Sequence, residues 1–256
     1  MDHRSYNADF LTSQVVARNV LAHRAWAYYS SASDDEISMH PISYGFSGYG
    51  SYMFAAHAEN ARAFARFFFL PRVLRPIEDC DPTTTILGYP SSLPIFVSGA
   101  ALAKLGHPLG EMNITTGVYT SPKSHLIQMV SSNASFPFYE IAKAAHPGQT
   151  LFFQLYKPHD NILAEQRVRA VEEAGYKAIF LTVDAVIAGR RERDIRSPWV
   201  LEDEERGFSP VHSEEKEAGS ASGVELNSLG TAGALIANND KNMTWEKVRR
   251  YNGYFG

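Results

Sequence analysis

The sequence predicts an α/β fold whose strands run parallel in one sheet. Apolar runs begin at Pro94, Leu126, Leu151 and Ala178, roughly 30 residues apart, which is the usual length of a strand–helix–strand unit. Segments with helical periodicity lie between these runs. Repetition at this interval favours parallel pairing with right-handed crossovers, because an antiparallel hairpin needs only a few connecting residues.

Three segments outside the strands carry helix signals. Residues Pro137–Ala145 have proline at an expected first turn, and Asn161–Ala174 have a capping residue at the start and Gly175 as a stop. At the amino end, Asp9–Tyr29 shows helical spacing of apolar residues without internal glycine or proline, so we expect one long helix there.

Two segments interrupt this organisation, which we otherwise read as one domain over residues 1–256. Residues 38–56 are rich in glycine, serine and tyrosine, without helical or strand periodicity, and are expected to be an atypical insertion. Residues 202–240 are acidic and poor in apolar side chains, so a mobile loop is expected. After this tract, Thr244 is expected to cap a short final helix.

Composition excludes several classes of function. A net charge of −4 gives no bulk attraction to nucleic acid or to an anionic membrane. Cys80 is the single cysteine, so an internal disulfide is impossible and a reducing compartment is expected. The sequence shows no apolar stretch near the ~20 residues of a membrane span and no targeting signal, so we expect a cytoplasmic protein.

Polar side chains close two of the apolar runs. Gln154 and Tyr156 end one run, and Thr182 and Asp184 end the other. Because side chains alternate along a strand, each pair lies on one face. The carboxyl ends of parallel strands are where α/β proteins place their active sites. A charged loop, Gly189–Asp194, follows at the same end, so the sequence predicts a polar pocket there.

The order and spacing of several short motifs resemble one enzyme family. The motifs are Trp26–Ser31, Phe68–Leu74, Thr84–Gly88, Ala103–Pro108, Phe153–Tyr156, and Thr182–Asp184 followed by Gly189–Asp194. Together they are similar to the FMN-dependent 2-hydroxy acid dehydrogenases, which include glycolate oxidase, the flavin domain of flavocytochrome b2 and fungal L-lactate dehydrogenase-like enzymes. The resemblance implies the N-terminal half of a (β/α)8 TIM-type barrel, with four parallel strands, helices and an N-terminal helical segment.

The resemblance also implies a chemistry and a set of site residues. FMN is the implied cofactor, and an L-lactate-like 2-hydroxy acid, oxidised to the 2-oxo acid, is the implied small-molecule substrate. The positions that match flavin-contacting residues are Gly99, Ala100, Ala101, Ser131, Gln154 and Thr182. Tyr28 matches the tyrosine that binds the substrate carboxylate, Tyr156 the one at the substrate hydroxyl, and Arg191 an arginine facing the active site. Asp184 matches the aspartate that steadies the catalytic histidine, so Asp184 and Tyr156 are the expected catalytic residues; no metal is expected.

Other motifs of the family do not occur in the sequence. These are the histidine in a Ser-Asn-His-Gly-Gly segment, the lysine of a fifth strand and the Gly-Arg-Pro region that holds the phosphate. We therefore expect a C-terminally truncated form that is inactive as this chain. The alternative is a non-catalytic half-barrel, acting as an interaction or flavin-binding module, which forms a homo-oligomer through its open sheet edges. A barrel enzyme for a phosphorylated substrate, or a Rossmann dehydrogenase, is disfavoured because the glycine-rich motifs of both are missing.

Overall fold

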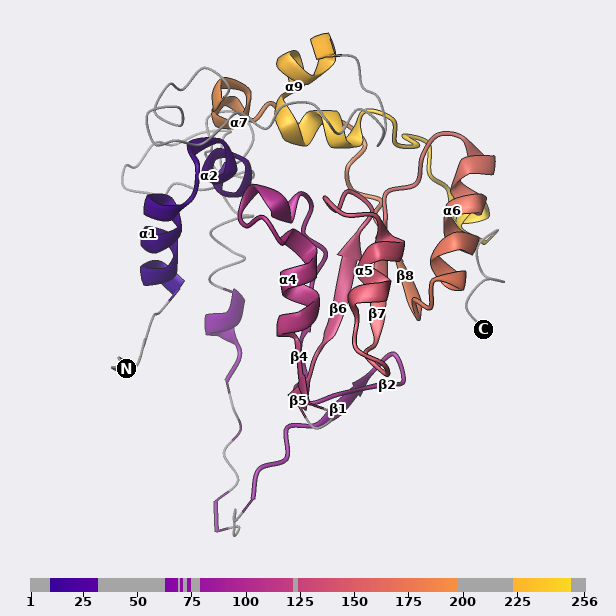
Figure 1. The fold of residues 1–256 in the computed structure, drawn as a ribbon. Helices are drawn as coiled ribbons and strands as arrows, with labels where there is room; N and C mark the ends of the chain where they lie inside the picture. Colours follow the sequence, from indigo (N-terminus) through magenta and orange to yellow (C-terminus); the bar gives the residue numbers. More distant parts are fainter. Residues whose placement is uncertain are drawn as a thin grey trace. The chain divides into compact units, whose positions relative to one another are not determined.

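The computed structural model describes residues 10–31, 63–68, 70, 73–74, 79–121, 124–197 and 223–249 (Figure 1). These residues divide into two compact units. One unit is drawn from Met1–Pro71 and Gly189–Ala234, and the other from Arg72–Ala188 and Leu235–Gly256. The predicted insertion at 38–56 lies outside the described residues, and the single-domain prediction stays a prediction.

A four-stranded parallel sheet forms the centre of the second unit. Its strands follow the order β3 (Phe96–Val97), β6 (Ile127–Ser131), β7 (Leu151–Leu155) and β8 (Ala178–Leu181). Each strand begins within two residues of the apolar run that predicted it. The prediction of four parallel strands is confirmed.

Helices cover one face of this sheet. They are α4 (Gly110–Gly117), α5 (Phe138–Ala144) and α6 (Asn161–Glu173). The predicted signals set the bounds of α6: Asp160 Oδ1 accepts hydrogen bonds from the backbone N–H groups of Ile162 and Leu163, and Gly175 follows the helix at a φ of +93°.

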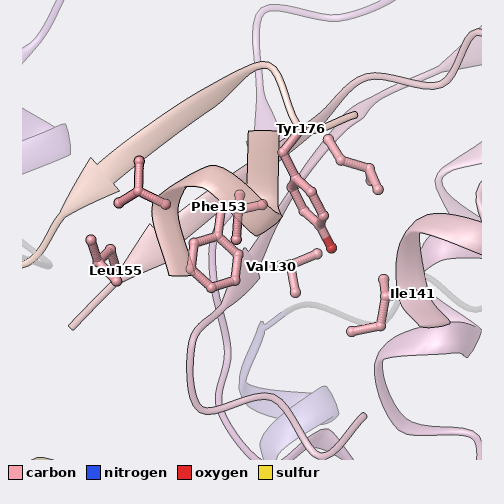
Figure 2. Close-up of a cluster of buried hydrophobic side chains, with 8 residues drawn as sticks. Val130, Ile141, Phe153, Leu155 and Tyr176 are labelled. Atoms are coloured by element: carbon pink, nitrogen blue, oxygen red, sulfur yellow. The ribbon is translucent and has the colours of Figure 1, made fainter. Parts of the chain in front are cut away.

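The core lies between these helices and the sheet, and includes the side chains of β6 and β7 that face the helices. Figure 2 shows Val130, Phe153 and Tyr176 directed toward one another, with Ile141 of α5 beside them. The rings of Phe153 and Tyr176 meet edge to face, with centroids 5.6 Å apart, and the Tyr176 hydroxyl donates to the Phe138 carbonyl at 2.8 Å. This cluster fixes which face of the sheet is covered.

The opposite face carries a second apolar cluster made largely of aromatic rings. Ile127, Met129 and Phe152 are its buried members. Phe180 of β8 contacts both Phe152, at a centroid distance of 5.5 Å, and Phe96, at 5.9 Å. Since residues two apart share a face, the polar side chains that follow on β6, β7 and β8 lie on this same face.

Two hairpins that the sequence analysis did not predict flank the sheet. β1 (Thr84–Ile86) pairs antiparallel with β2 (Tyr89–Ser91), and β4 (Tyr119–Ser121) pairs with β5 (Ser124–His125). Tyr89 contacts the ring of Phe152 with centroids 6.0 Å apart. The first hairpin therefore covers the aromatic face near the amino end of β7 (Figure 1). The polar side chains that follow the strands lie at the opposite, carboxyl end of the sheet.

The other unit contains α1 (Phe10–Val20), α2 (His23–Ser30), a 3-10 turn (Phe64–Arg66) and α7 (Glu192–Arg196). The prediction of one helix over Asp9–Tyr29 was wrong. Ala22 has an extended conformation, with φ −56° and ψ 147°, which separates α1 from α2. The helical period continues through the break, so the spacing of apolar residues could not reveal it.

The structure also differs from the prediction of a mobile loop over residues 202–240. A helix, α9 (Gly223–Ile236), occupies part of the tract 202–240 that was expected to be a loop, and residues 201–222 lie outside the described part. Gly230, at φ 70°, divides α9 into two helical segments. The last helix, α10 (Trp245–Arg249), begins after Thr244 as predicted. None of the described helices is long and apolar enough to cross a lipid bilayer.

Candidate active site

Four polar side chains meet at the carboxyl ends of β7 and β8, as the alternation of the sequence predicts. Gln154 Nε2 donates to Thr182 Oγ1 at 3.0 Å. Burial raises the pKa of the Tyr156 hydroxyl, and the negative charge of Asp184 raises it further, whereas a hydrogen bond with Gln154 acts in the opposite direction. Tyr156 therefore stays protonated at neutral pH and lies close to both Gln154 and Asp184.

Two hydrogen bonds donated by backbone N–H groups hold the rim, which is the set of residues at the carboxyl ends of β6, β7 and β8. Ser132 N donates to the Gln154 carbonyl at 2.9 Å, and Tyr156 N donates to Ser132 Oγ at 3.0 Å. This bond holds the backbone of Tyr156 in place, although Tyr156 follows the last residue of β7. The side chain is half-buried, and Asp184 is exposed to solvent.

The loop after β3 approaches the same rim. A Cβ added to Gly99 would lie 2.9 Å from Gln154 Oε1 and 3.3 Å from Gln154 Cβ, so the backbone at Gly99 touches the amide side chain. Ala100 and Ala101 follow in this loop, the first exposed and the second half-buried. Ser131, at the end of β6, is 2% exposed, and its Oγ accepts from Asn133 N at 3.2 Å.

Replacement of Gly99 by alanine is expected to push the Gln154 amide away from Thr182. The loss of this hydrogen bond should lower the free energy of unfolding by about 1 kcal/mol in chemical denaturation. Gly117, at the end of α4, is the matched control, because a Cβ there has nothing within 4 Å and alanine favours a helix. Equal effects of Gly99→Ala and Gly117→Ala would contradict the close approach of Gly99 to Gln154.

Tyr28 and Arg191 lie together in the other unit. Arg191 Nη2 donates to the carbonyl oxygens of Tyr28 and Ser31, the latter at 2.8 Å, and Nε donates to Ser31 Oγ at 3.1 Å. The guanidinium carbon lies 5.4 Å from the centroid of the Tyr28 ring. Arg193 donates to the Ser30 carbonyl at 2.9 Å, so two arginines bind the carboxyl end of α2, where cations are favoured.

A buried ion cluster, which was not predicted from the sequence, lies directly after the rim. Lys157 Nζ and Lys247 Nζ contact Asp240 Oδ2 at 2.8 Å and 2.9 Å, and the side chains of Lys157 and Asp240 are 1% and 3% exposed. Burial alone would raise the pKa of Asp240, but hydrogen bonds from both lysines and from Asn242 N outweigh it and hold this pKa well below its usual range. No local pattern could show this cluster, because Lys157 and Asp240 are 83 residues apart.

The model of the FMN-dependent dehydrogenase family matches residues 39–254. The chain belongs to the FMN-dependent dehydrogenase family. Curated relatives in this family include an L-lactate dehydrogenase (cytochrome) of Wickerhamomyces anomalus, 38% identical over 194 residues, and glycolate oxidase 1 of Zea mays, 33% identical over 242 residues.

A solved structure supports the same family. The flavin-binding domain of flavocytochrome b2 from baker's yeast matches with a TM-score of 0.70 at 29% identity, over 96% of this chain and 51% of that one. The two curated relatives are matched over 76% and 92% of this chain but over only 30% and 56% of their own length. The chain thus spans about half, or less, of the relatives that it matches.

The cofactor of this family is FMN. The residues of the rim fit the flavin ring of this cofactor. A flat ring needs close approach of backbone and small side chains, which Gly99–Ala101 offer beside Gln154. Its polar edge needs amide and hydroxyl partners, which Gln154 and Thr182 offer on one face.

Proposed function

We propose that this chain provides the flavin-ring part of an FMN-dependent oxidoreductase that converts an L-lactate-like 2-hydroxy acid to the 2-oxo acid. One observation carries the proposal: the Gln154–Thr182 pair lies beside Tyr156 and Asp184 at the carboxyl ends of parallel strands. Family membership supports it. The four strands correspond in this proposal to the N-terminal half of a (β/α)8 barrel.

In this proposal the residues have separate tasks. Gly99, Ala100, Ala101 and Ser131 lie along the ring, and Gln154 and Thr182 bind its polar edge. FMN, when bound, supplies the electron acceptor for the hydroxy acid. The protonated Tyr156 hydroxyl donates a hydrogen bond to the oxygen on the carbon that is oxidised. The family resemblance assigns the substrate carboxylate to Tyr28 and an active-site position to Arg191.

Asp184 acts on charge in the proposed reaction. An exposed carboxylate beside the substrate hydroxyl stabilises a cationic base that has taken up the hydroxyl proton. The histidine motif that the family resemblance assigns to this base does not occur in the sequence. We therefore propose that these 256 residues alone do not oxidise the substrate, and lactate oxidation by the purified chain would contradict that.

Flavin titration tests the proposal. Because the proposed contacts are made to the ring, riboflavin, which lacks the phosphate, should bind as well as FMN, with dissociation constants that agree within about threefold. Gln154→Leu should weaken both by about tenfold, since it removes the amide partner of the ring edge. Quenching of flavin fluorescence gives both constants. Failure of either flavin to bind would contradict the proposal, and so would an unchanged affinity in Gln154→Leu.

A non-catalytic half-barrel that pairs with itself is the second candidate. Within the described residues, β3 and β8 are the outer strands of the four-stranded order, each with a strand on one side only. Such edges can pair with another chain. Sedimentation of the chain with and without riboflavin separates the candidates: a stable dimer that binds no flavin would favour self-pairing.

A further inference from the structure

One buried carboxylate has no part in the proposed chemistry. Glu111, in the first turn of α4, is 2% exposed. Its Oε1 accepts hydrogen bonds from the backbone N–H groups of Ala103 and Ser135, both at 2.9 Å. Its Oε2 is buried without a hydrogen-bond partner in the described part of the chain. Because burial of a carboxylate is costly, its position needs an explanation.

The two N–H groups belong to different loops at the carboxyl end of the sheet. Ala103 opens the 3-10 turn that follows β3, and Ser135 lies between β6 and α5. Two direct hydrogen bonds join the same loops, from Leu102 N to Asn133 O and from Lys104 N to Ser135 Oγ, each at 3.1 Å. Glu111 therefore completes a set of contacts that holds the loops at a fixed separation.

The loop after β3 also contains a strained residue. Leu102 adopts a left-handed conformation, with φ 55° and ψ 41°. A residue with a large side chain adopts this conformation only when its surroundings hold it there. Its neighbour Ala103 is one of the two groups bound by Glu111. The carboxylate thus helps to hold the backbone that leads out of Gly99–Ala101.

We infer that Glu111 is a positioning residue for the flavin site. By binding Ala103 and Ser135 at once, it sets the distance between the Gly99–Ala101 backbone and Ser131, the two segments that we propose to lie along the ring. The inference rests on the proposed function for its flavin part. Its structural part, the coupling of the loops, depends only on the two hydrogen bonds that Glu111 accepts.

Hydrogen exchange followed by NMR, with three variants, tests the loop coupling. Glu111→Ala removes the shared acceptor, so the amides of Ala103 and Ser135 should exchange about tenfold faster or more. Glu111→Gln keeps one carbonyl oxygen at the place of Oε1, so both amides should stay within about threefold of the original rate. Asn113→Ala, an exposed change on the same helix, is the control and should leave both amides unaffected. Unchanged exchange in Glu111→Ala, or equal exchange in Glu111→Ala and Glu111→Gln, would overturn the inference.

Riboflavin titration of the same variants tests the flavin part. The dissociation constant should rise about tenfold in Glu111→Ala and stay close to the original value in Glu111→Gln and Asn113→Ala. Equal affinity of Glu111→Ala and the unaltered chain would overturn the flavin part of the inference alone. Absence of binding by the unaltered chain would contradict the proposed function, and the flavin part with it, while the exchange rates still decide the coupling of the loops.

Discussion

Replacement of Asp240 by asparagine is expected to lower the free energy of unfolding by about 3 kcal/mol at pH 7, because it leaves the buried Lys157 ammonium without its carboxylate. Lys157 Nζ retains the Pro158 carbonyl at 3.0 Å, which is a neutral partner. Lys247 also loses its contact but is more exposed, so it contributes less. Chemical denaturation of the two proteins measures the difference.

The pH dependence of this loss follows from the lowered pKa of Asp240. A carboxyl whose pKa is lowered by folding stabilises the fold fully at pH values above its ordinary pKa of 3.8. This stabilisation is lost as the pH falls from there through the pKa of the folded state. Asp240→Asn has no such group, so the difference between the two proteins should shrink below about pH 4. A difference that is independent of pH between 7 and 3 would contradict the ionised pair.

Phe153→Ala is expected to have a comparable or larger effect, about 3–5 kcal/mol, because it leaves a cavity in the core between the sheet and its helices. Phe153 is 1% exposed and contacts both Tyr176 and Phe138 edge to face. Denaturation by urea measures the loss. Ile162→Ala, on α6 at 68% exposure, is the control and should cost well under about 1 kcal/mol. Equal losses in the two variants would contradict the burial of Phe153.

Local sequence patterns were sufficient to predict the sheet and its polar rim. A strand period of two residues puts Gln154 and Tyr156 on one face and Phe153 on the other, and the same rule applies to Thr182 and Asp184. Helix caps were equally local: a cap at Asp160 or Asn161 was expected, and Asp160 is the N-cap of α6. Such features depend on neighbours within a few residues, so short stretches of sequence are sufficient to predict them.

Features that depend on distant contacts could not be predicted in this way. The bond from Ser135 to Glu111 joins residues 24 apart, and the Lys157–Asp240 pair joins residues 83 apart. Glu111, Lys157 and Asp240, read alone, are ordinary charged residues that would be assigned to the surface. The helix α9 was missed for a related reason: the composition of residues 202–240 was averaged over an acidic part and an apolar part.

The Gln154 side-chain amide gives the most direct test of the account. Its ¹⁵N–¹H signals, assigned by their loss in Gln154→Leu, should shift during a riboflavin titration and saturate with the affinity measured by fluorescence. The Asn113 amide, exposed on α4, should not shift. An unmoved Gln154 amide in a chain that binds riboflavin would contradict the central claim that this rim holds the edge of the flavin ring.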